Sequence, residues 1–377
     1  MNSTADSTTT VKPTSSAPSR SRDMLAVLAL YAGCIAAAII LSMVLVQVTG
    51  GPPGKVFSAL LNGSIRKPGR WGQTLTESAP LLMVALGTAI CYRAGLVNIG
   101  QEGQLLMGAA AAAFVTIRFK IDGPFGILVA LLAGIGAGAL WAGIAGALRF
   151  GRRVPEVLST LLLVYVAGSL GGYLLTRKFL LLDHDQGTGN TLTRSGSVPS
   201  NTHIPYVHIF GNDFPMSVLV GLTLALFLWL ALDRSVWGFR LRMLGQNLRT
   251  AQRSGVSAAM YGGTAILLSG GFAGLAGSSM LLGGSGSYQF TPSFSNGVGW
   301  QGLLVALVAR NNPLGAIAAA VVFAGLRTGS TFLSATGVGA TIVDIIQALL
   351  VLAMLVPSAL LFVRDRRRAL VAVRSRT

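Results

Sequence analysis

The sequence predicts an all-α fold, a polytopic membrane helical bundle with about ten transmembrane helices, in a range of about 8–10. Only 11% of its 377 residues are charged, whereas soluble proteins carry about 25%. The mean hydropathy is +0.65, and long apolar blocks recur along the chain at lengths that suit a bilayer. These observations exclude a soluble globular enzyme.

Ten apolar blocks are the candidate spans. They cover about 24–48, 76–92, 97–117, 124–148, 156–176, 215–232, 261–282, 300–310, 313–335 and 341–363. The block at 300–310 is about half the roughly 20 residues that a span needs, and the block at 97–117 opens with a polar run. Non-helical backbone survives at membrane depth only where protein or water satisfies it, so re-entrant or broken helices are expected at 97–104 and 300–310.

Polar segments border this transmembrane domain of residues 24–363. Residues 1–23 are rich in Ser, Thr and Pro and are expected to form a disordered cytoplasmic tail, and 364–377 a basic cytoplasmic tail. About twice as many Lys and Arg fall in inner segments as in outer ones, which favours both termini in the cytoplasm. The net charge of +17 is thereby assigned to orientation and to contact with membrane lipid, and no nucleic-acid partner is expected.

Glycine is abundant, with 48 residues. Several glycines lie four apart inside apolar blocks, among them Gly134 with Gly138 and Gly270 with Gly274. Small residues at this spacing let helix backbones approach closely in a membrane, where no hydrophobic effect drives association. The spacing therefore predicts close helix packing.

No motif for covalent chemistry is present. The nearest approach to a phosphate loop, at Gly54-Lys55-Val56, has valine where the hydroxyl belongs, so this chain is not expected to hydrolyse nucleotide. The outer loop 177–214 holds all three histidines, His184, His203 and His208. Their spacing matches no metal signature, and scattered polar residues of a solvated loop are the favoured interpretation. We expect no catalytic residue and no bound metal.

Ionisable residues inside apolar blocks are rare and usually face a bundle interior or an aqueous path. Glu102, Arg327 and Asp344 are the main cases. Glu102 lies between glycines, and two interpretations stay open. It can accept hydrogen bonds from the backbone of a broken helix, or it can contact a polar substrate.

The inner loop 233–260 is basic and longer than a helix connection requires. Asn247 can cap a short helix over about 248–254, which Gly255 would end. Arg249 and Arg253, four apart, would share one face of it. The loop either orients the protein in the membrane or docks a cytoplasmic partner.

Two runs carry a family resemblance. The run Arg93-Ala-Gly-Leu-Val-Asn-Ile-Gly-Gln-Glu-Gly-Gln-Leu-Leu-Met-Gly108 resembles the signature of membrane permeases of bacterial ABC importers for ribose-type sugars, nucleosides and branched-chain amino acids. The run Gly297-Val-Gly-Trp-Gln-Gly-Leu-Leu-Val-Ala-Leu-Val-Ala-Arg-Asn-Asn-Pro-Leu-Gly315 matches a second family stretch. The resemblance covers about 75–362 and is greatest to nucleoside permeases that work with basic-membrane-lipoprotein-type binding proteins. Residues 240–256 resemble the family's coupling segment but carry Leu248 where the family has proline and Gln252 where it has alanine.

The resemblance implies an importer in the bacterial cytoplasmic membrane that moves nucleosides by alternating access. Its partners would be a second homologous permease subunit in a heterodimer, a cytoplasmic ABC ATPase that binds the ATP and Mg, and an extracellular substrate-binding lipoprotein, and this chain would bind no cofactor. The implied substrate pathway consists of Asn98, Gln101, Glu102, Gln104, Trp300 and Gln301. The implied ATPase-coupling residues are Arg240, Arg242, Gly245, Asn247, Arg249, Arg253 and Gly255.

Two alternatives remain open at this point. Within the family, the substrate could be a ribose- or galactose-type sugar or a branched-chain amino acid. From another class, the chain could be a standalone proton-coupled secondary transporter with Glu102, Arg327 and Asp344 as its proton relay.

Overall fold

The computed structural model describes residues 20–177, 179–182, 193–209, 211–284, 288–334 and separate residues between 342 and 364. Helices make up nearly all the regular structure of this part of the chain, and its strands form one hairpin, β1 (Tyr206–Ile209) with β2 (Asn212–Pro215). Seven of the described helices are long and apolar enough to cross a membrane. The prediction of an all-α, multi-pass membrane bundle is therefore confirmed.

Each predicted apolar block up to residue 335 contains a helix. These helices are α1 (Arg20–Val48), α3 (Arg70–Arg93), α4 (Gln101–Phe119), α5 (Gly123–Arg152), α6 (Glu156–Leu174), α7 (Ser217–Arg234), α10 (Ala258–Leu282), α11 (Val298–Val308) and α12 (Pro313–Ser334). The described residues of the last block, 341–363, are helical too. Because α4 begins with a polar turn and α11 has only 11 residues, ten crossings stay a prediction.

The structure tests the predicted boundaries of the two tails only in part. Helix α1 begins at Arg20, inside the predicted tail 1–23. Residues 1–19 and 365–377 lie outside the described residues, as do His184 and Asp344. The domain limits at 24 and 363 therefore stay predictions.

Short helices occupy three segments between the spans. Helix α2 (Gly54–Leu61) continues into the π-helix η1 (Asn62–Arg66), and η2 (Ser200–Thr202) is a single 3-10 turn. Helices α8 (Val236–Gln246) and α9 (Leu248–Arg253) fill the loop between α7 and α10. None of α2, η1 or α8 was expected, because each is too short to give an apolar block.

Close glycine contacts position α10 at the centre of the bundle. A Cβ on Gly274 of α10 would lie 2.1 Å from the carbonyl oxygen of Gly134 in α5, and a Cβ on Gly138 would lie 2.3 Å from the carbonyl oxygen of Gly270. A side chain at either position would force the helices apart, so the predicted small-residue packing is confirmed.

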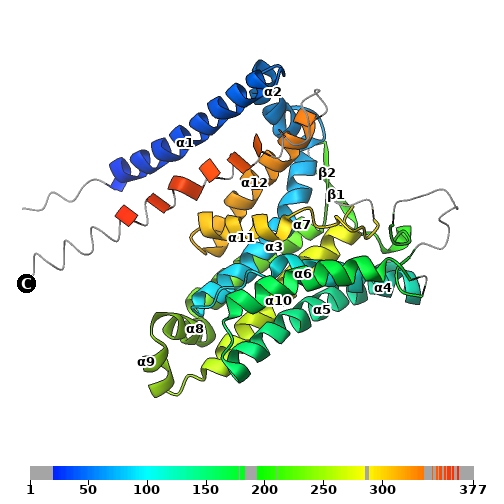
Figure 1. Ribbon diagram of the computed structural model, residues 1–377, viewed down its shortest axis with the longest axis vertical. Helices are drawn as coiled ribbons and strands as arrows, with labels where there is room; N and C mark the ends of the chain where they lie inside the picture. The colour runs from blue at the N-terminus through cyan, green and yellow to red at the C-terminus, as the bar shows by residue number, and fades with distance from the viewer. Residues whose placement is uncertain are drawn as a thin grey trace, which may run out of the picture.

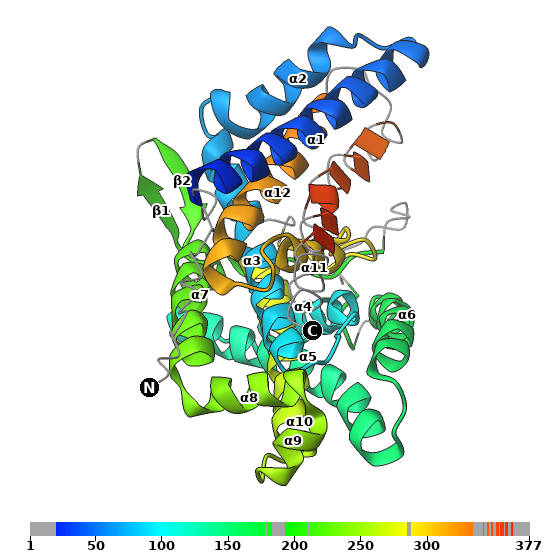
Figure 2. The same cartoon turned by 90° about the vertical axis from the view of Figure 1, so that its left-hand side faces the viewer.

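The bundle has two distinct ends (Figure 1). Helices α8 and α9 lie at one end, which we call the α9 end, and the β1–β2 strands lie at the other, which we call the hairpin end. Helix α3 joins them, because Gly72 packs against Asp213 at the hairpin end and Gly95, just after α3, packs against Gly245 at the α9 end. Figure 2 shows α1 beside α2, away from α5 and α6.

Candidate functional site

Two helices begin inside the protein. After α3 ends at Arg93, the non-helical segment 94–100 leads from the α9 end back to the start of α4 at Gln101. Segment 288–297 leads from the hairpin end to the start of α11 at Val298. The predicted breaks are therefore present but shifted, since 101–104 form the first turn of α4 and the short block at 300–310 is mostly α11.

Glu102 connects the first turns of these two helices. Its Oε2 atom accepts a hydrogen bond of 2.7 Å from the backbone N–H of Gly299, and its Oε1 atom accepts one from the hydroxyl of Ser295. The two backbones are so close that a Cβ on Gly299 would lie 2.5 Å from Cα of Glu102. Since helix N-termini carry partial positive charge, a buried carboxylate here favours both helix starts. The hydrogen-bonding interpretation of Glu102 is confirmed, and its contact with substrate stays a prediction.

The three polar neighbours of Glu102 bond to one another and to α10. Asn98 Nδ2 donates to Gln104 Oε1 (2.8 Å) and to Ser269 Oγ (2.9 Å), and Gln104 Nε2 returns a bond to Asn98 Oδ1 (3.0 Å). Gln101 Nε2 donates to Ser269 Oγ (3.0 Å), and the Thr88 hydroxyl donates to Gln101 Oε1 (2.9 Å). We call these residues the Asn98 network.

Burial decides what the Asn98 network does. Asn98, Gln101 and Gln104 are only 1–2% exposed. Buried amides with partners of this kind stabilise one arrangement of the backbone. The network therefore holds the break in the chain between α3 and α4, and the contact of its amides with substrate stays a prediction.

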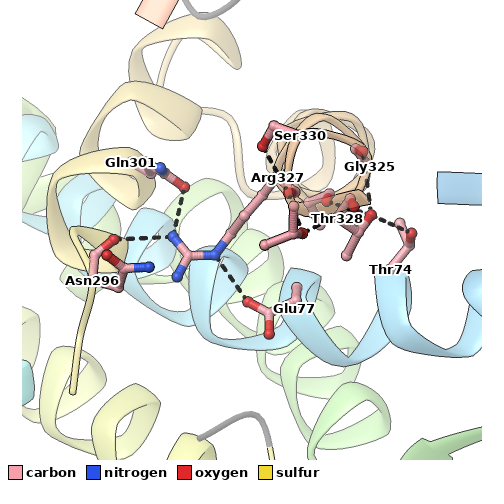
Figure 3. Close-up of polar contacts among 10 residues, drawn as sticks. Thr74, Glu77, Asn296, Gln301, Gly325, Arg327, Thr328 and Ser330 are labelled. Carbon is pink, nitrogen blue, oxygen red and sulfur yellow. Dashed lines mark hydrogen bonds and ion pairs between the residues drawn. The ribbon is translucent and has the colours of Figure 1, made fainter. Parts of the chain in front are cut away.

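A second polar cluster joins α3, α11 and α12 (Figure 3). Arg327 Nε lies 3.1 Å from Oε2 of Glu77. Arg327 Nη1 donates to the carbonyl oxygen of Asn296 (3.1 Å) and to Oε1 of Gln301 (3.4 Å). We call Glu77, Asn296, Gln301 and Arg327 the Arg327 cluster. Sequence reasoning found Gln301 and Arg327 but missed the pairing with Glu77.

Trp300 lies next to this cluster in α11. Trp300 is 38% exposed, and α11 is otherwise an apolar helix. Of the six predicted pathway residues, the structure thus brings Asn98, Gln101 and Gln104 into one network, places Glu102 at the α4–α11 junction, and leaves Trp300 and Gln301 on the less buried side.

At the hairpin end, segment 193–204 is attached to the segment that leads into α11. The N–H of Ser195 donates to the carbonyl of Phe290 and that of Val198 to the carbonyl of Tyr288, both at 2.9 Å. The ring of His203 stacks on Tyr288 with 3.6 Å between centroids. Any movement of this loop would therefore pull on the entry to α11.

The polar groups of the hairpin itself do not form a metal site. Burial is the largest cause that raises the pKa of the Tyr206 phenol above its usual range, and the hydrogen bond with Tyr288 is the second. Tyr206 therefore stays protonated and donates to the Gly283 carbonyl (2.7 Å). His208 lies 2.6 Å from Asp213, and both are well exposed. Among the described residues, no group of three His, Cys, Asp or Glu side chains could hold a metal ion.

At the α9 end, the predicted short helix is confirmed. Asn247 Oδ1 accepts a hydrogen bond of 3.1 Å from the N–H of Thr250, which caps α9 at Leu248. Gly255 follows the helix with φ of +81°, a left-handed conformation that glycine adopts without strain. The helix forms even though Leu248 and Gln252 depart from the family pattern.

The arginines of this loop fall into two groups. In the first group, Arg242 pairs with Asp233 at 3.0 Å and Arg240 donates to the hydroxyl of Tyr261. Asp233 also pairs with Arg93, at the end of α3, at 3.1 Å. Arg249 and Arg253 of α9 are exposed, and no hydrogen bond or ion pair joins either of them to another residue in the part of the chain that the structure describes. Among the described residues of α8 and α9, the side chains of this second group are therefore the arginines that remain available to bind another molecule.

Comparison with known proteins gives concordant matches. The family model "Branched-chain amino acid transport system / permease component" matches residues 71–361. The guanosine ABC transporter permease protein NupP of Bacillus subtilis (strain 168) is 32% identical over 350 residues, 91% of this chain and 96% of that protein. The glucose ABC transporter permease protein TsgB13 of Haloferax volcanii is 33% identical over 293 residues, 74% of each chain.

A second guanosine ABC transporter permease protein of Bacillus subtilis, NupQ, is 28% identical over 252 residues, 66% of this chain and 78% of that protein. No solved structure matches the chain. The region matched by the family model contains the α4–α11 junction, the Arg327 cluster and helices α8 and α9.

Proposed function

This chain belongs to the family of branched-chain amino acid transport system permease components, and from that premise we propose that it is one of two permease subunits of an importer that moves nucleosides across the bacterial cytoplasmic membrane. In this proposal both termini are cytoplasmic, so the α9 end faces the cytoplasm and the hairpin end faces outward.

The relatives support both the substrate and the second subunit. NupP, a guanosine permease protein, matches nearly the whole length of this chain. NupP and NupQ come from one bacterium, carry the same substrate in their names, and both resemble this chain. A partner of related but different sequence is therefore the proposed second permease subunit.

The observation that carries the proposal is the meeting of two helix starts at Glu102. A helix that begins in the interior leaves backbone and side-chain polar groups at membrane depth, which a bilayer tolerates only in protein or beside water. In this protein the polar groups at the starts of α4 and α11 lie beside the Arg327 cluster. A path for a polar, neutral solute needs such donors and acceptors with an occasional aromatic face.

We further propose a mechanical route from the ATPase to this junction. Arg249 and Arg253 would bind the cytoplasmic ABC ATPase, where the ATP and Mg reside. A displacement of α8 and α9 would act on Gly95, because a Cβ there would lie 2.8 Å from Cα of Gly245. Gly95 lies in segment 94–100, which carries Asn98 and leads to Glu102 in the first turn of α4. The α4–α11 junction would therefore move with α9.

An extracellular binding lipoprotein would act at the opposite end. Segment 193–204 is exposed in part and is bonded to the chain that leads into α11. A protein that docks on the hairpin end would therefore contact the same junction through Tyr288 and Phe290.

A sugar permease is the second candidate, because TsgB13 is 33% identical to this chain. Uptake of labelled guanosine by proteoliposomes that contain the co-purified complex would separate the candidates. We expect ATP-dependent uptake that unlabelled nucleosides inhibit and glucose, ribose and leucine do not. Inhibition by a sugar or by leucine would overturn the nucleoside assignment.

The same vesicles test the proton-coupled alternative. Collapsing the proton gradient while ATP is maintained should leave uptake unchanged. Loss of uptake under this condition would identify a secondary transporter instead.

A further inference from the structure

The Arg327 cluster lies at the depth of the hydrocarbon. Helix α3 has 24 residues and is about 36 Å long, and Glu77 lies about 10 Å along it from Arg70. On α12, Arg327 lies about 21 Å from Pro313 by the same rise of about 1.5 Å per residue. Since the hydrocarbon core of a bilayer is about 30 Å thick, both charged groups fall within it.

This cluster is only partly covered by the chain itself. The side chains of Arg327 and Glu77 are 15% and 13% exposed, Asn296 is exposed and Gln301 is half-buried. The exposed faces of α5 and α6 differ sharply, since they present Leu140 and Leu162, at 74% and 55% exposure. Charged and amide groups in contact with lipid are strongly disfavoured. The face with the Arg327 cluster is therefore covered by water or by another protein, and α5 and α6 by lipid.

The charges of this face cancel. Glu77 neutralises Arg327, and the guanidinium also donates to the Asn296 carbonyl and to Gln301. An anion consequently finds no net positive charge here, whereas a neutral solute finds amide groups and the exposed indole of Trp300. An indole face suits a flat ring or the apolar face of a sugar ring.

We propose that the Arg327 cluster and Trp300 line the solute path at the face toward the second permease subunit, and that the Glu77–Arg327 pair makes this path selective for uncharged polar solutes. The inference rests on the proposed function for the existence of a path, and it adds where the path runs and what excludes charged solutes. In this proposal Arg327 forms an ion pair with Glu77 of α3. Its presence in an apolar helix is then explained without a proton relay.

The first test is water accessibility. In a chain whose two natural cysteines, Cys34 and Cys91, are replaced by alanine, Trp300→Cys is compared with Leu162→Cys on the apolar face of α6. An uncharged but hydrophilic, membrane-impermeant methanethiosulfonate reagent is applied to the assembled complex in vesicles. We expect labelling at 300 and no labelling at 162. Saturating guanosine, delivered by the binding protein, should slow the labelling at 300 severalfold. Equal behaviour of the two positions would overturn the inference.

The second test changes the charge of the cluster. Glu77→Gln leaves the charge of Arg327 without its carboxylate partner, so uptake of the neutral nucleoside should fall at least about tenfold. Inhibition by a nucleoside 5′-monophosphate, absent in the parent complex, should appear. The double substitution Glu77→Gln with Arg327→Gln restores neutrality and should remove that inhibition.

Thr74→Val with Thr328→Val is the matched control. These two hydroxyls lie 3.0 Å apart between the same two helices, so the control tests helix pairing without altering charge and should leave the inhibition profile unchanged. Nucleoside uptake with an unchanged inhibition profile in Glu77→Gln would overturn the inference. Labelling at 300 in a complex that carries no nucleoside would instead overturn the proposed substrate and leave the path in place.

Discussion

The carboxylate of Glu102 in α4 accepts a hydrogen bond of 2.7 Å from the backbone N–H of Gly299 in α11. The bond joins the first turn of a helix entered from the α9 end to the first turn of a helix entered from the hairpin end. Neither segment contains another described carboxylate that bonds to the start of α11. One side chain thereby couples the two interruptions in the bundle.

Removal of this carboxylate should abolish uptake. Glu102→Ala leaves the Gly299 N–H and the Ser295 hydroxyl without their acceptor in a buried place, which costs about 1–3 kcal/mol of stability for each unpartnered group. Uptake in proteoliposomes and the melting temperature of the purified complex measure the two effects. Glu102→Gln, which keeps one acceptor oxygen, should lose less stability. Unchanged transport by a normally assembled Glu102→Ala complex would contradict the prediction.

The closeness of α4 and α11 gives a second prediction. A methyl group at Gly299 would lie 2.5 Å from the backbone N and Cα of Glu102, so Gly299→Ala should destabilise the complex by about 1–3 kcal/mol, as overpacking does. Gly136→Ala is the control, because a Cβ at this position of α5 meets nothing within 4 Å and alanine favours a helix. Thermal unfolding should separate the two variants, and equal melting temperatures would refute the close approach.

Charge reversal on α9 should uncouple ATP hydrolysis from substrate. Arg249→Glu and Arg253→Glu change exposed side chains without intramolecular partners among the described residues, so the fold should persist while docking to the ATPase weakens. Arg234→Glu is the control, since Arg234 is exposed at the end of α7 but lies outside α9. Substrate-stimulated ATPase activity is the measurement. Stimulation that survives in both α9 variants would show that the docking assignment is wrong.

Asn98 should be needed for stability and not for selectivity. Asn98→Ala removes the side chain that bonds both Gln104 and Ser269, and the buried partners left behind should cost about 1–3 kcal/mol each. We expect a lower melting temperature and an unchanged order of preference among nucleosides in competition assays. A changed order with a normal melting temperature would place Asn98 in the substrate path.

Local features of this protein could be predicted from its sequence. Apolar blocks predicted the positions of the nine long or apolar helices α1, α3 to α7 and α10 to α12, because a bilayer requires a continuous apolar run. Asn247 and Gly255 predicted the bounds of α9, because capping depends on neighbouring residues. Gly134 and Gly274 were found for a similar reason, since their spacing within each helix is itself the signal.

The contacts between distant segments could not be predicted in this way. Glu77 and Arg327 are ordinary rare charges in their own blocks, and only the packing of α12 on α3 makes them a pair. The amides of Asn98 and Gln104 look available for a solute in the sequence, yet the fold turns them toward each other. Residue type specifies what a side chain can bond, whereas tertiary structure decides which partner it has.

The departure of α9 from its family pattern yields a last prediction. Leu248 occupies the first position of α9, where proline is favoured because the N–H has no acceptor within the helix. The preceding Asn247 is already extended, with φ of −153° and ψ of 101°, as a residue before proline must be. Leu248→Pro should therefore keep the melting temperature and the coupled ATPase activity. Gln252→Pro, inside the helix, should cost about 3 kcal/mol locally and lose coupling. Loss of coupling in Leu248→Pro with a normal melting temperature would mean that the Leu248 side chain, 49% exposed, itself contacts the ATPase.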